Sequence, residues 1–181
     1  MSQEIVHYFA YGANRSLEMM EAITGNKNLV VSPTVLKGYE LCIQKLNQIP
    51  DAPRKLLQDI WPENFSSYVI RPSSNKDNQV AGVLWELTPL ERELVRDWEL
   101  IEMGWYKDEK VKVTKDGKEI EVETEVLGDG QRVDRVVDGT DYPTFLNELG
   151  NFQKIANNAR EEYFERQKNK EGRLNSPERK L

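Results

Sequence analysis

The segment IVHYFAYGANRS, residues 5–16, constrains the fold more than any other stretch of this chain. Its apolar residues fall on both alternating sides of an extended segment, which is typical of a strand that is covered on both faces. The two sides are Val6, Tyr8 and Ala10 on one, and His7, Phe9 and Tyr11 on the other. The strand pattern stops at Gly12-Ala13-Asn14. This turn is either ordinary strand-to-helix punctuation or a place where main-chain N–H groups face a ligand.

Length and composition favour one soluble globular domain. The chain has 181 residues, of which 38% are hydrophobic and 31% charged, enough for a single substantial core. A net charge of −6 argues against a nucleic-acid partner, which would normally meet a basic face. No apolar run approaches the roughly 20 residues that cross a bilayer, and the N-terminus lacks a signal-peptide core. With the single cysteine Cys42, which excludes an internal disulfide, we expect a cytoplasmic protein without membrane contact.

Strand and helix signals alternate irregularly, which favours an α+β domain over a regular βαβ repeat. The strongest helix signal begins at Thr88, an N-cap followed by Pro89 and by Glu91, which completes a capping box. We expect further elements as follows: a helix over 16–24, strands over 34–45, 66–72 and 79–87, a hairpin over 106–128 and a helical region over 142–170. Residues 47–64, with three prolines, are expected to form an irregular excursion. One domain over 1–165 is expected to precede a charged tail over 166–181.

The sequence contains few candidate residues for a metal site or for a catalytic nucleophile. The single His7 and single Cys42 cannot form a zinc cluster of Cys/His type, and no loop has the spacing of a calcium site. His7 is more simply a structural strand residue, and Cys42, between Leu41 and Ile43, a small buried residue. Neither a Gly-x-Ser-x-Gly elbow nor a phosphate-binding glycine motif is present.

Carboxylates are the remaining candidates for chemistry. In the helix that starts at Thr88, Leu90, Leu94 and Trp98 form the expected buried stripe, and Glu99 and Glu102 lie near its border at the C-terminal end. A carboxylate there meets the negative end of the helix dipole, which raises its pKa, as partial burial also would. Periodicity does not choose between these two glutamates, and a solvated acidic face is the simpler alternative.

Two segments together resemble the γ-glutamylcyclotransferase-like superfamily. YFAYGAN (8–14) is similar to the family's YFAYGSN strand and loop. GVLWELTPLERELVRDWELIEMGWYKDEKVKV (82–113) resembles the family's strand, helix, acidic residue and Gly-x-Tyr, in which the functional glutamate precedes the tyrosine by seven residues, as Glu99 precedes Tyr106. The segment YPTFLNELGNFQKIANNAREEYFE, from residue 142, looks more loosely like the closing tyrosine, glycine and helix.

The resemblance implies a small mixed β-barrel with helices around it. It also implies a cofactor-independent enzyme that cleaves a small-molecule γ-glutamyl amide by internal cyclisation, releasing 5-oxoproline and an amine or amino acid. In this reading Glu99 is the general acid and base, and the N–H groups of the Gly12–Asn14 turn stabilise the oxyanion. The substrate-binding residues that it implies are Tyr8, Phe9, Ala10, Tyr11, Gly12, Ala13, Asn14, Tyr106 and Tyr142.

Three departures from the family pattern keep a second hypothesis open. Ala13 replaces the usual serine, Arg15 follows the asparagine where an apolar residue is common, and Asn151 follows Gly150 in place of alanine. The alternative is a non-catalytic module that binds a small ligand or a partner on the same barrel. Separately from this choice, Tyr106 and Tyr142 are either substrate-pocket residues or core aromatics, and Arg15 is either a clamp for a substrate carboxylate or a solvated residue at a helix start.

The leaving amine also stays open at this point. An amino acid, a γ-glutamyl-ε-lysine product and a γ-glutamyl-protected biosynthetic intermediate all fit the implied reaction. The excursion over 47–64 is the segment most suited to shape this side of the site.

Overall fold

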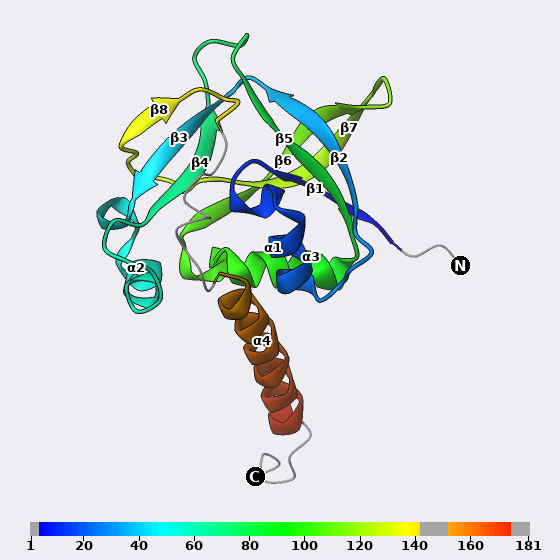
Figure 1. The fold of residues 1–181 in the computed structure, drawn as a ribbon, viewed down its shortest axis with the longest axis vertical. Helices are drawn as coiled ribbons and strands as arrows, with labels where there is room; N and C mark the ends of the chain where they lie inside the picture. Colours follow the sequence, from blue (N-terminus) through cyan, green and yellow to red (C-terminus); the bar gives the residue numbers. More distant parts are fainter. Residues whose placement is uncertain (1–3, 142–151, 175–181) are drawn as a thin grey trace.

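A five-stranded mixed sheet forms the centre of the computed structural model, which describes residues 4–141 and 152–174 (Figure 1). Its strands lie in the order β2 (Val30–Lys37), β5 (Gln79–Leu87), β1 (Val6–Ala10), β7 (Lys118–Leu127) and β6 (Tyr106–Lys115). Strand β1 pairs antiparallel with β5 and parallel with β7. The predicted hairpin is formed by β6 and β7, and both residues of its Asp116-Gly117 turn have positive φ angles.

A second, antiparallel sheet packs against the first. Its order is β4 (Ser66–Pro72), β3 (Tyr39–Lys45) and β8 (Arg135–Val137), and the last of these strands was not predicted. Side chains of both sheets share one apolar cluster, which includes Phe9, Leu41 and Ile70. The α+β fold agrees with expectation, but among the described residues the two sheets do not close into the hydrogen-bonded barrel that was expected.

The change from one sheet to the other occurs at Gly38, inside the segment 34–45 that was predicted as a single strand. Gly38 has a φ angle of +84°, which glycine adopts freely and other residues do not. Strand β2 therefore ends at Lys37 on the edge of the first sheet, and β3 starts at Tyr39 in the second. The alternating pattern runs on through the glycine, so it could not show this change of sheet.

The segment 47–64 was predicted from its prolines to be irregular, but this is only partly correct. It contains helix α2 (Asp51–Gln58), which follows the short 3₁₀ turn η2 (Leu46–Gln48). Pro50 precedes this helix and Pro53 lies in its first turn, where backbone N–H groups have no partner within the helix. These two prolines are therefore compatible with the helix rather than obstacles to it.

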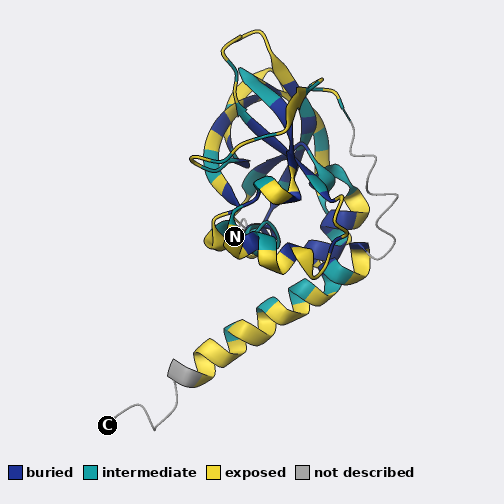
Figure 2. Ribbon diagram, turned by 90° about the vertical axis from the view of Figure 1, so that its left-hand side faces the viewer, coloured by how far each residue is buried: buried dark blue, intermediate teal, exposed yellow. Residues whose placement is uncertain are grey.

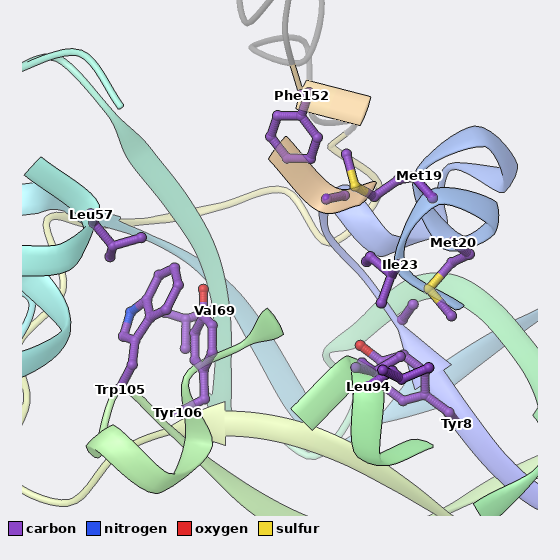
Figure 3. Close-up of a cluster of buried hydrophobic side chains, with 14 of the residues drawn as sticks. Tyr8, Met19, Met20, Ile23, Leu57, Val69, Leu94, Trp105, Tyr106 and Phe152 are labelled. Atoms are coloured by element: carbon purple, nitrogen blue, oxygen red, sulfur yellow. The ribbon is translucent and has the colours of Figure 1, made fainter. Parts of the chain in front are cut away.

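Strand β1 is covered on both faces, as its sequence predicts. Phe9 and Tyr11 belong to the cluster between the two sheets. Tyr8 and Ala10 belong to a second cluster, shared with helices α1 (Leu17–Thr24) and α3 (Pro89–Trp98). Figure 3 shows Tyr8 beside Leu94 of α3 in this second cluster. The strand therefore separates a core between sheets from a core between sheet and helices.

Helix α3 has the predicted capping box, and Leu94 and Trp98 of the predicted stripe pack in the core, but Leu90 does not and the buried face extends to other residues. Leu90 is 50% exposed, whereas Arg92 is only 2% exposed and Val95 is fully buried. Residues 92, 95 and 99 follow one another at the spacing of one helix face. Burial of Arg92 is tolerated because three carboxylates accept its N–H groups, as described below.

Helix α4 (Phe152–Leu174) packs its first turns against α1 and α3, where Phe152 and Ala156 are buried. Its later turns project from the rest of the molecule and are mostly exposed (Figure 2). The helix continues past residue 165, the expected domain boundary, as far as Leu174. Tyr142 and Asn151 lie outside the described residues. No helix of the described part is both long and apolar enough to cross a bilayer.

Candidate active site

A cavity of about 1000 Å³ opens where the turn after β1 faces the C-terminal end of α3. Seven of the predicted site residues line it, namely Tyr8, Tyr11, Gly12, Ala13, Asn14, Glu99 and Tyr106. Two others do not line the cavity, since Phe9 packs between the sheets and Ala10 packs against the helices. Tyr142 lies outside the described residues. The fold thus brings two segments that are far apart in sequence, 8–14 and 99–106, to one cavity.

Glu99 stands at the C-terminal cap of α3, where the chain leaves the helix. Its N–H donates to the carbonyl oxygen of Val95 over 2.9 Å. The next residue, Leu100, has a φ angle of +54°, which is uncommon for a residue with a side chain. Glu99 itself is half-buried, whereas the alternative Glu102 is exposed at the rim of the cavity.

Asn14 connects the turn to this carboxylate. Its Nδ2 donates to Glu99 Oε1 over 2.7 Å and to the Tyr8 hydroxyl over 3.0 Å. Its backbone carbonyl accepts a hydrogen bond of 2.9 Å from Trp85 Nε1, which holds the turn against β5. The side-chain Oδ1 of Asn14 is buried and accepts no hydrogen bond from the described residues. The site therefore offers a buried acceptor that an N–H group of a ligand could satisfy.

The turn itself leaves several backbone N–H groups available. The carbonyl oxygens of Gly12 and Ala13 accept from the N–H groups of Arg15 and Ser16, over 3.0 and 3.1 Å, and this forms the 3₁₀ turn η1 (Ala13–Arg15). The first N–H groups of a helical turn have no acceptor within it. In the described part of the chain, the N–H groups of residues 12–14 donate to no acceptor. Such groups are suited to stabilise an oxyanion.

The environment of Glu99 makes its carboxyl group unusually basic. Burial raises the pKa of Glu99 to about 8, and the negative charge of Glu125 acts in the same direction. The hydrogen bond from Asn14 and the positive charge of Arg92 oppose this rise in pKa. The sequence analysis correctly expected burial to raise the pKa of Glu99. It did not foresee the second cause of this rise, the charge of another carboxylate.

Glu125, on β7, is a buried member of the cavity wall that the sequence analysis missed. It is 3% exposed, and its Oε2 accepts a hydrogen bond of 2.8 Å from the Tyr8 hydroxyl. Its Oε1 accepts from Arg92 Nη1 over 3.1 Å. The other N–H groups of Arg92 donate to Glu123 Oε1 over 2.9 Å and to Asp108 Oδ1 over 3.1 Å. One guanidinium thus pairs with the buried Glu125 and with two partly exposed carboxylates.

The sequence signal for Glu125 was misleading. In β7 the acids at positions 119, 121, 123 and 125 alternate with apolar or small residues, which is typical of a solvent-facing side. Glu119 and Glu121 do face solvent. At Glu123 and Glu125 the same side of the strand meets Arg92 of α3, which covers Glu123 in part and Glu125 almost completely. The only sequence signal for the burial of Glu125 was Arg92, a charged residue on the same face of the helix as Val95 and Glu99.

Tyr106 is both a core aromatic and a cavity residue, so the two alternatives for it are not exclusive. Its hydroxyl donates to the Tyr68 carbonyl oxygen over 3.2 Å and is hydrogen-bonded to Ser67 Oγ. Its ring stacks on that of Trp105 with centroids 4.2 Å apart (Figure 3). Burial raises the pKa of Tyr106 well above 10, and the pKa values of Tyr8 and Tyr11 are raised for the same reason. All three hydroxyls are therefore neutral donors.

One wall of the outer part of the cavity is aromatic and apolar, although charged residues of α3 and α4 also line the cavity. Trp61 stacks on Phe65 and on Phe152, with ring centroids 5.7 and 4.9 Å apart. Leu56 and Ile60, which are exposed, lie on the same side. Trp61, Leu56 and Ile60 come from the segment 47–64, so this segment does shape the cavity.

The other candidate residues lie away from this centre. Cys42 is buried, and burial raises the pKa of its thiol to about 11, so that the reactive thiolate is rare near neutral pH. His7 Nε2 lies 3.8 Å from Glu86 Oε1, on the strand outside the cavity. The Arg15 guanidinium donates to the Asp141 carbonyl oxygen over 3.3 Å. Within residues 4–141 and 152–174, no cluster of three or more His, Cys, Asp or Glu side chains is arranged to hold a metal ion.

Comparison with known protein families shows to which family this chain belongs. The family model described as gamma-glutamyl cyclotransferase, AIG2-like, matches residues 8–144, which include the turn, Glu99, Tyr106 and Glu125. The chain belongs to this family. The family resemblance noted from YFAYGAN and from the spacing of Glu99 and Tyr106 is thereby confirmed. No curated protein sequence matches the chain significantly.

Solved structures share the fold of this family member at low sequence identity. The uncharacterized protein loc79017 from Homo sapiens is 20% identical, with a TM-score of 0.58, over 92% of this chain and 88% of that one. A gamma-glutamyl cyclotransferase is 20% identical, with a TM-score of 0.58, over 84% and 86% of the two chains. YkqA from Bacillus subtilis is 16% identical, with a TM-score of 0.52, over 84% of this chain and 49% of its own. At these identities the likeness establishes the fold.

Proposed function

We propose that this protein is a γ-glutamyl cyclotransferase that acts on a small γ-glutamyl amide without a cofactor. The observation that carries the proposal is that Glu99 and the Gly12–Asn14 turn line one cavity, joined by the hydrogen bond from Asn14 to Glu99. Family membership and the related folds support the general class of reaction. The roles given below to individual residues are part of the proposal.

The reaction needs no enzyme nucleophile. The substrate's own α-amine attacks its γ-carbonyl carbon, a C–N bond closes the five-membered ring, and the γ-amide C–N bond breaks. The products are 5-oxoproline and a free amine. The protein must hold the α-amine close to the carbonyl, because correct orientation supplies a large part of the rate gain in such reactions. Tyr8, Tyr11 and Tyr106 line the part of the cavity where this folded γ-glutamyl group would lie.

Glu99 carries the proton in this proposal. An α-ammonium has a pKa of roughly 8, so an ordinary glutamate would be a weak base toward it. Because burial raises the pKa of Glu99 to about 8, transfer of the ammonium proton to Glu99 is nearly balanced in free energy. The protonated Glu99 then gives this proton to the leaving nitrogen. After ring closure the ring nitrogen still carries one proton too many, and Glu99 passes this second proton in the same direction, so that the amine leaves as an ammonium ion. The substrate ammonium and amide thus become a neutral lactam and an ammonium, and atoms and charge balance without a further reactant.

The turn supplies the electrostatic stabilisation. As the ring closes, negative charge develops on the γ-carbonyl oxygen, and the available N–H groups of residues 12–14 are the proposed donors to it. Ala13 lacks the hydroxyl of the family's serine but keeps the backbone N–H. We therefore expect this departure to affect the choice of substrate more than the oxyanion contact. The aromatic outer cavity is the proposed place of the leaving amine.

The test is to incubate the protein with a panel of γ-glutamyl amino acids, γ-glutamyl-ε-lysine and γ-glutamyl amines, and to measure 5-oxoproline. We expect release from at least one of these conjugates, with an equal amount of free amine. If a folded protein releases 5-oxoproline from none of them but binds one by calorimetry, the alternative of a non-catalytic binding module replaces this proposal.

A further inference from the structure

Glu125 is a second buried carboxylate in the cavity, and the cyclisation described above gives it no step. It lines the same cavity as Glu99 and is 3% exposed. A carboxylate is costly to bury unless cations or hydrogen-bond donors compensate it. Glu125 has both kinds of compensation, from Arg92 and from Tyr8. The arrangement holds a negative charge at a fixed place beside the proposed proton carrier.

Two hydrogen-bonded groups join Glu125 to Glu99. The Tyr8 hydroxyl donates to Glu125 Oε2 over 2.8 Å and accepts from Asn14 Nδ2 over 3.0 Å. The same Nδ2 donates to Glu99 Oε1 over 2.7 Å. Because Tyr8 and Asn14 are both buried, this chain of contacts fixes the positions of the two carboxylates relative to each other.

The compensating cation lies on Glu125 and not on Glu99. Arg92 forms ion pairs with Glu125, Glu123 and Asp108, and none of the ion pairs found in the described residues includes Glu99. The pKa of Glu125 is raised by burial, and the charge of Arg92 and the Tyr8 hydrogen bond oppose this rise. The carboxylate is held by its contacts: Oε1 accepts from Arg92 Nη1 over 3.1 Å and Oε2 accepts from the Tyr8 hydroxyl over 2.8 Å.

The remaining groups that face the pair do not replace this charge. The hydroxyls of Tyr8, Tyr11 and Tyr106 are neutral, since burial raises their pKa values well above 10. Arg96, farther along α3, forms ion pairs with Asp108 and Glu93. Glu125, paired with Arg92, is therefore the carboxylate whose like charge acts most directly on Glu99.

We propose that Glu125 is a positioning residue whose fixed negative charge, held by Arg92 and connected through Tyr8 and Asn14, keeps Glu99 basic enough to accept a proton from the substrate's α-ammonium. This role rests on the proposed function, in which Glu99 moves that proton. The two carboxylates then share one cavity but have different tasks, because the cation sits on only one of them. Glu125 contacts no reacting atom in this scheme.

The test measures the titration of Glu99 directly and without substrate. In protein labelled with ¹³C at glutamate, the carboxyl signal of Glu99, assigned with Glu99→Gln, is followed against pH. Glu125→Gln is expected to lower its midpoint by on the order of one pH unit, since a like charge is removed. Glu123→Gln is the matched control: it is the same chemical change on the same strand and also touches Arg92, but it lies outside the cavity wall. It should leave the midpoint close to that of the wild type.

The kinetic consequence has a distinct signature. With the best conjugate of the panel, Glu125→Gln should lower the plateau value of kcat, which is reached above both midpoints, by up to about tenfold, as expected when a fully ionised base loses about one unit of pKa, and should change KM less. The pH at which the rate rises should move down together with the NMR midpoint. An unchanged Glu99 midpoint in a folded Glu125→Gln protein overturns the proposal.

A second variant guards against a folding defect. The double change Arg92→Gln with Glu125→Gln removes the buried charge pair together, and it should also lower the midpoint, because the effect of Glu125 on Glu99 is larger than that of Arg92. A midpoint at or above that of the wild type contradicts the proposal. If the wild-type protein cleaves no conjugate while the midpoint still moves, the proposed function fails and the electrostatic link between the two carboxylates stands.

Discussion

The inner and the outer ends of the cavity are lined by different types of side chain. At the inner end, Asn14 and Tyr8 connect Glu99 to Glu125 through hydrogen bonds of 2.7–3.0 Å, and a buried arginine holds Glu125. At the outer end, Trp61 and its aromatic neighbours form stacked pairs, and exposed apolar residues such as Ile60 stand at the rim. The inner end holds charged groups in fixed positions, whereas the outer end provides apolar surface that a ligand can contact.

This difference separates two properties of the proposed enzyme. Changes at the inner end should alter the chemical step, because charges and donors there act on the reacting atoms. Changes at the outer end should alter the affinity for the leaving amine, because apolar contacts are formed equally in the ground state and the transition state. Four measurements can break or sharpen this division.

The largest effect is expected for Glu99→Gln. The amide has nearly the same shape as the carboxyl group but cannot move the proton, so kcat should fall by on the order of 10²–10⁴ while substrate binding is retained. Steady-state kinetics together with calorimetric binding measure both quantities. Glu102→Gln, three residues farther along, is the control and should keep its activity. A Glu99→Gln protein with wild-type turnover would remove Glu99 from the mechanism.

Asn14→Ala should have the next largest effect. It removes the donor that joins Glu99 to Tyr8 and should lower kcat by roughly 10–100-fold, the usual value of a hydrogen bond to a charged group. Since the Asn14 hydrogen bond lowers the pKa of Glu99, the rate profile should move to higher pH, opposite in direction to Glu125→Gln. A profile that does not move, or that moves to lower pH, contradicts the role given to this contact.

The raised pKa of Glu99 also predicts how stability depends on pH. In the unfolded chain Glu99 ionises near 4.5, but in the folded protein only near 8, so the folded state holds an extra proton between these values. The contribution of this proton to the free energy of unfolding is fully present below about pH 4.5 and is lost as pH rises toward 8. Glu99→Gln should therefore raise Tm relative to the wild type at pH 8 by on the order of a few degrees, and less at pH 5. An equal difference at both pH values would show that Glu99 has an ordinary pKa when folded.

The smallest effect is expected at the outer end. Ile60→Ser removes exposed apolar surface from the rim without opening the core, so KM should rise a few-fold and kcat should stay the same. The effect should be larger for conjugates of bulky apolar amines than for γ-glutamylalanine. A change in kcat that is equal for all conjugates would show that the two ends of the cavity do not act independently.

Much of the fold followed from local patterns, and the exceptions have physical causes. The capping box at Thr88 and the Asp116-Gly117 hairpin were predicted because each depends on a few adjacent residues. The change of sheet at Gly38 was missed because alternation continues through it. Helix α2 was missed because its prolines lie before it and in its first turn, where they do not break a helix.

The site was only partly accessible from sequence. The turn and Glu99 were found by their resemblance to a family motif, since periodicity alone did not separate Glu99 from Glu102. Glu125 escaped because an acid in an alternating strand looks solvated until the element that covers it is known. The predicted stripe through Leu90 hid Arg92 for the same reason, because burial of an arginine depends on carboxylates from distant strands.

The hydrogen bonds at the inner end have a consequence for how the chain reaches its native state. Asn14 and Glu99 are 85 positions apart, and Tyr8 and Glu125 are 117 apart. Contacts of such long sequence separation form late, because the entropy of closing long loops must be met first. The helices and the β6–β7 hairpin can form before these contacts exist. During refolding, recovery of a working centre therefore trails the recovery of the helices and of the β6–β7 hairpin, and catalytic competence marks completion of the fold.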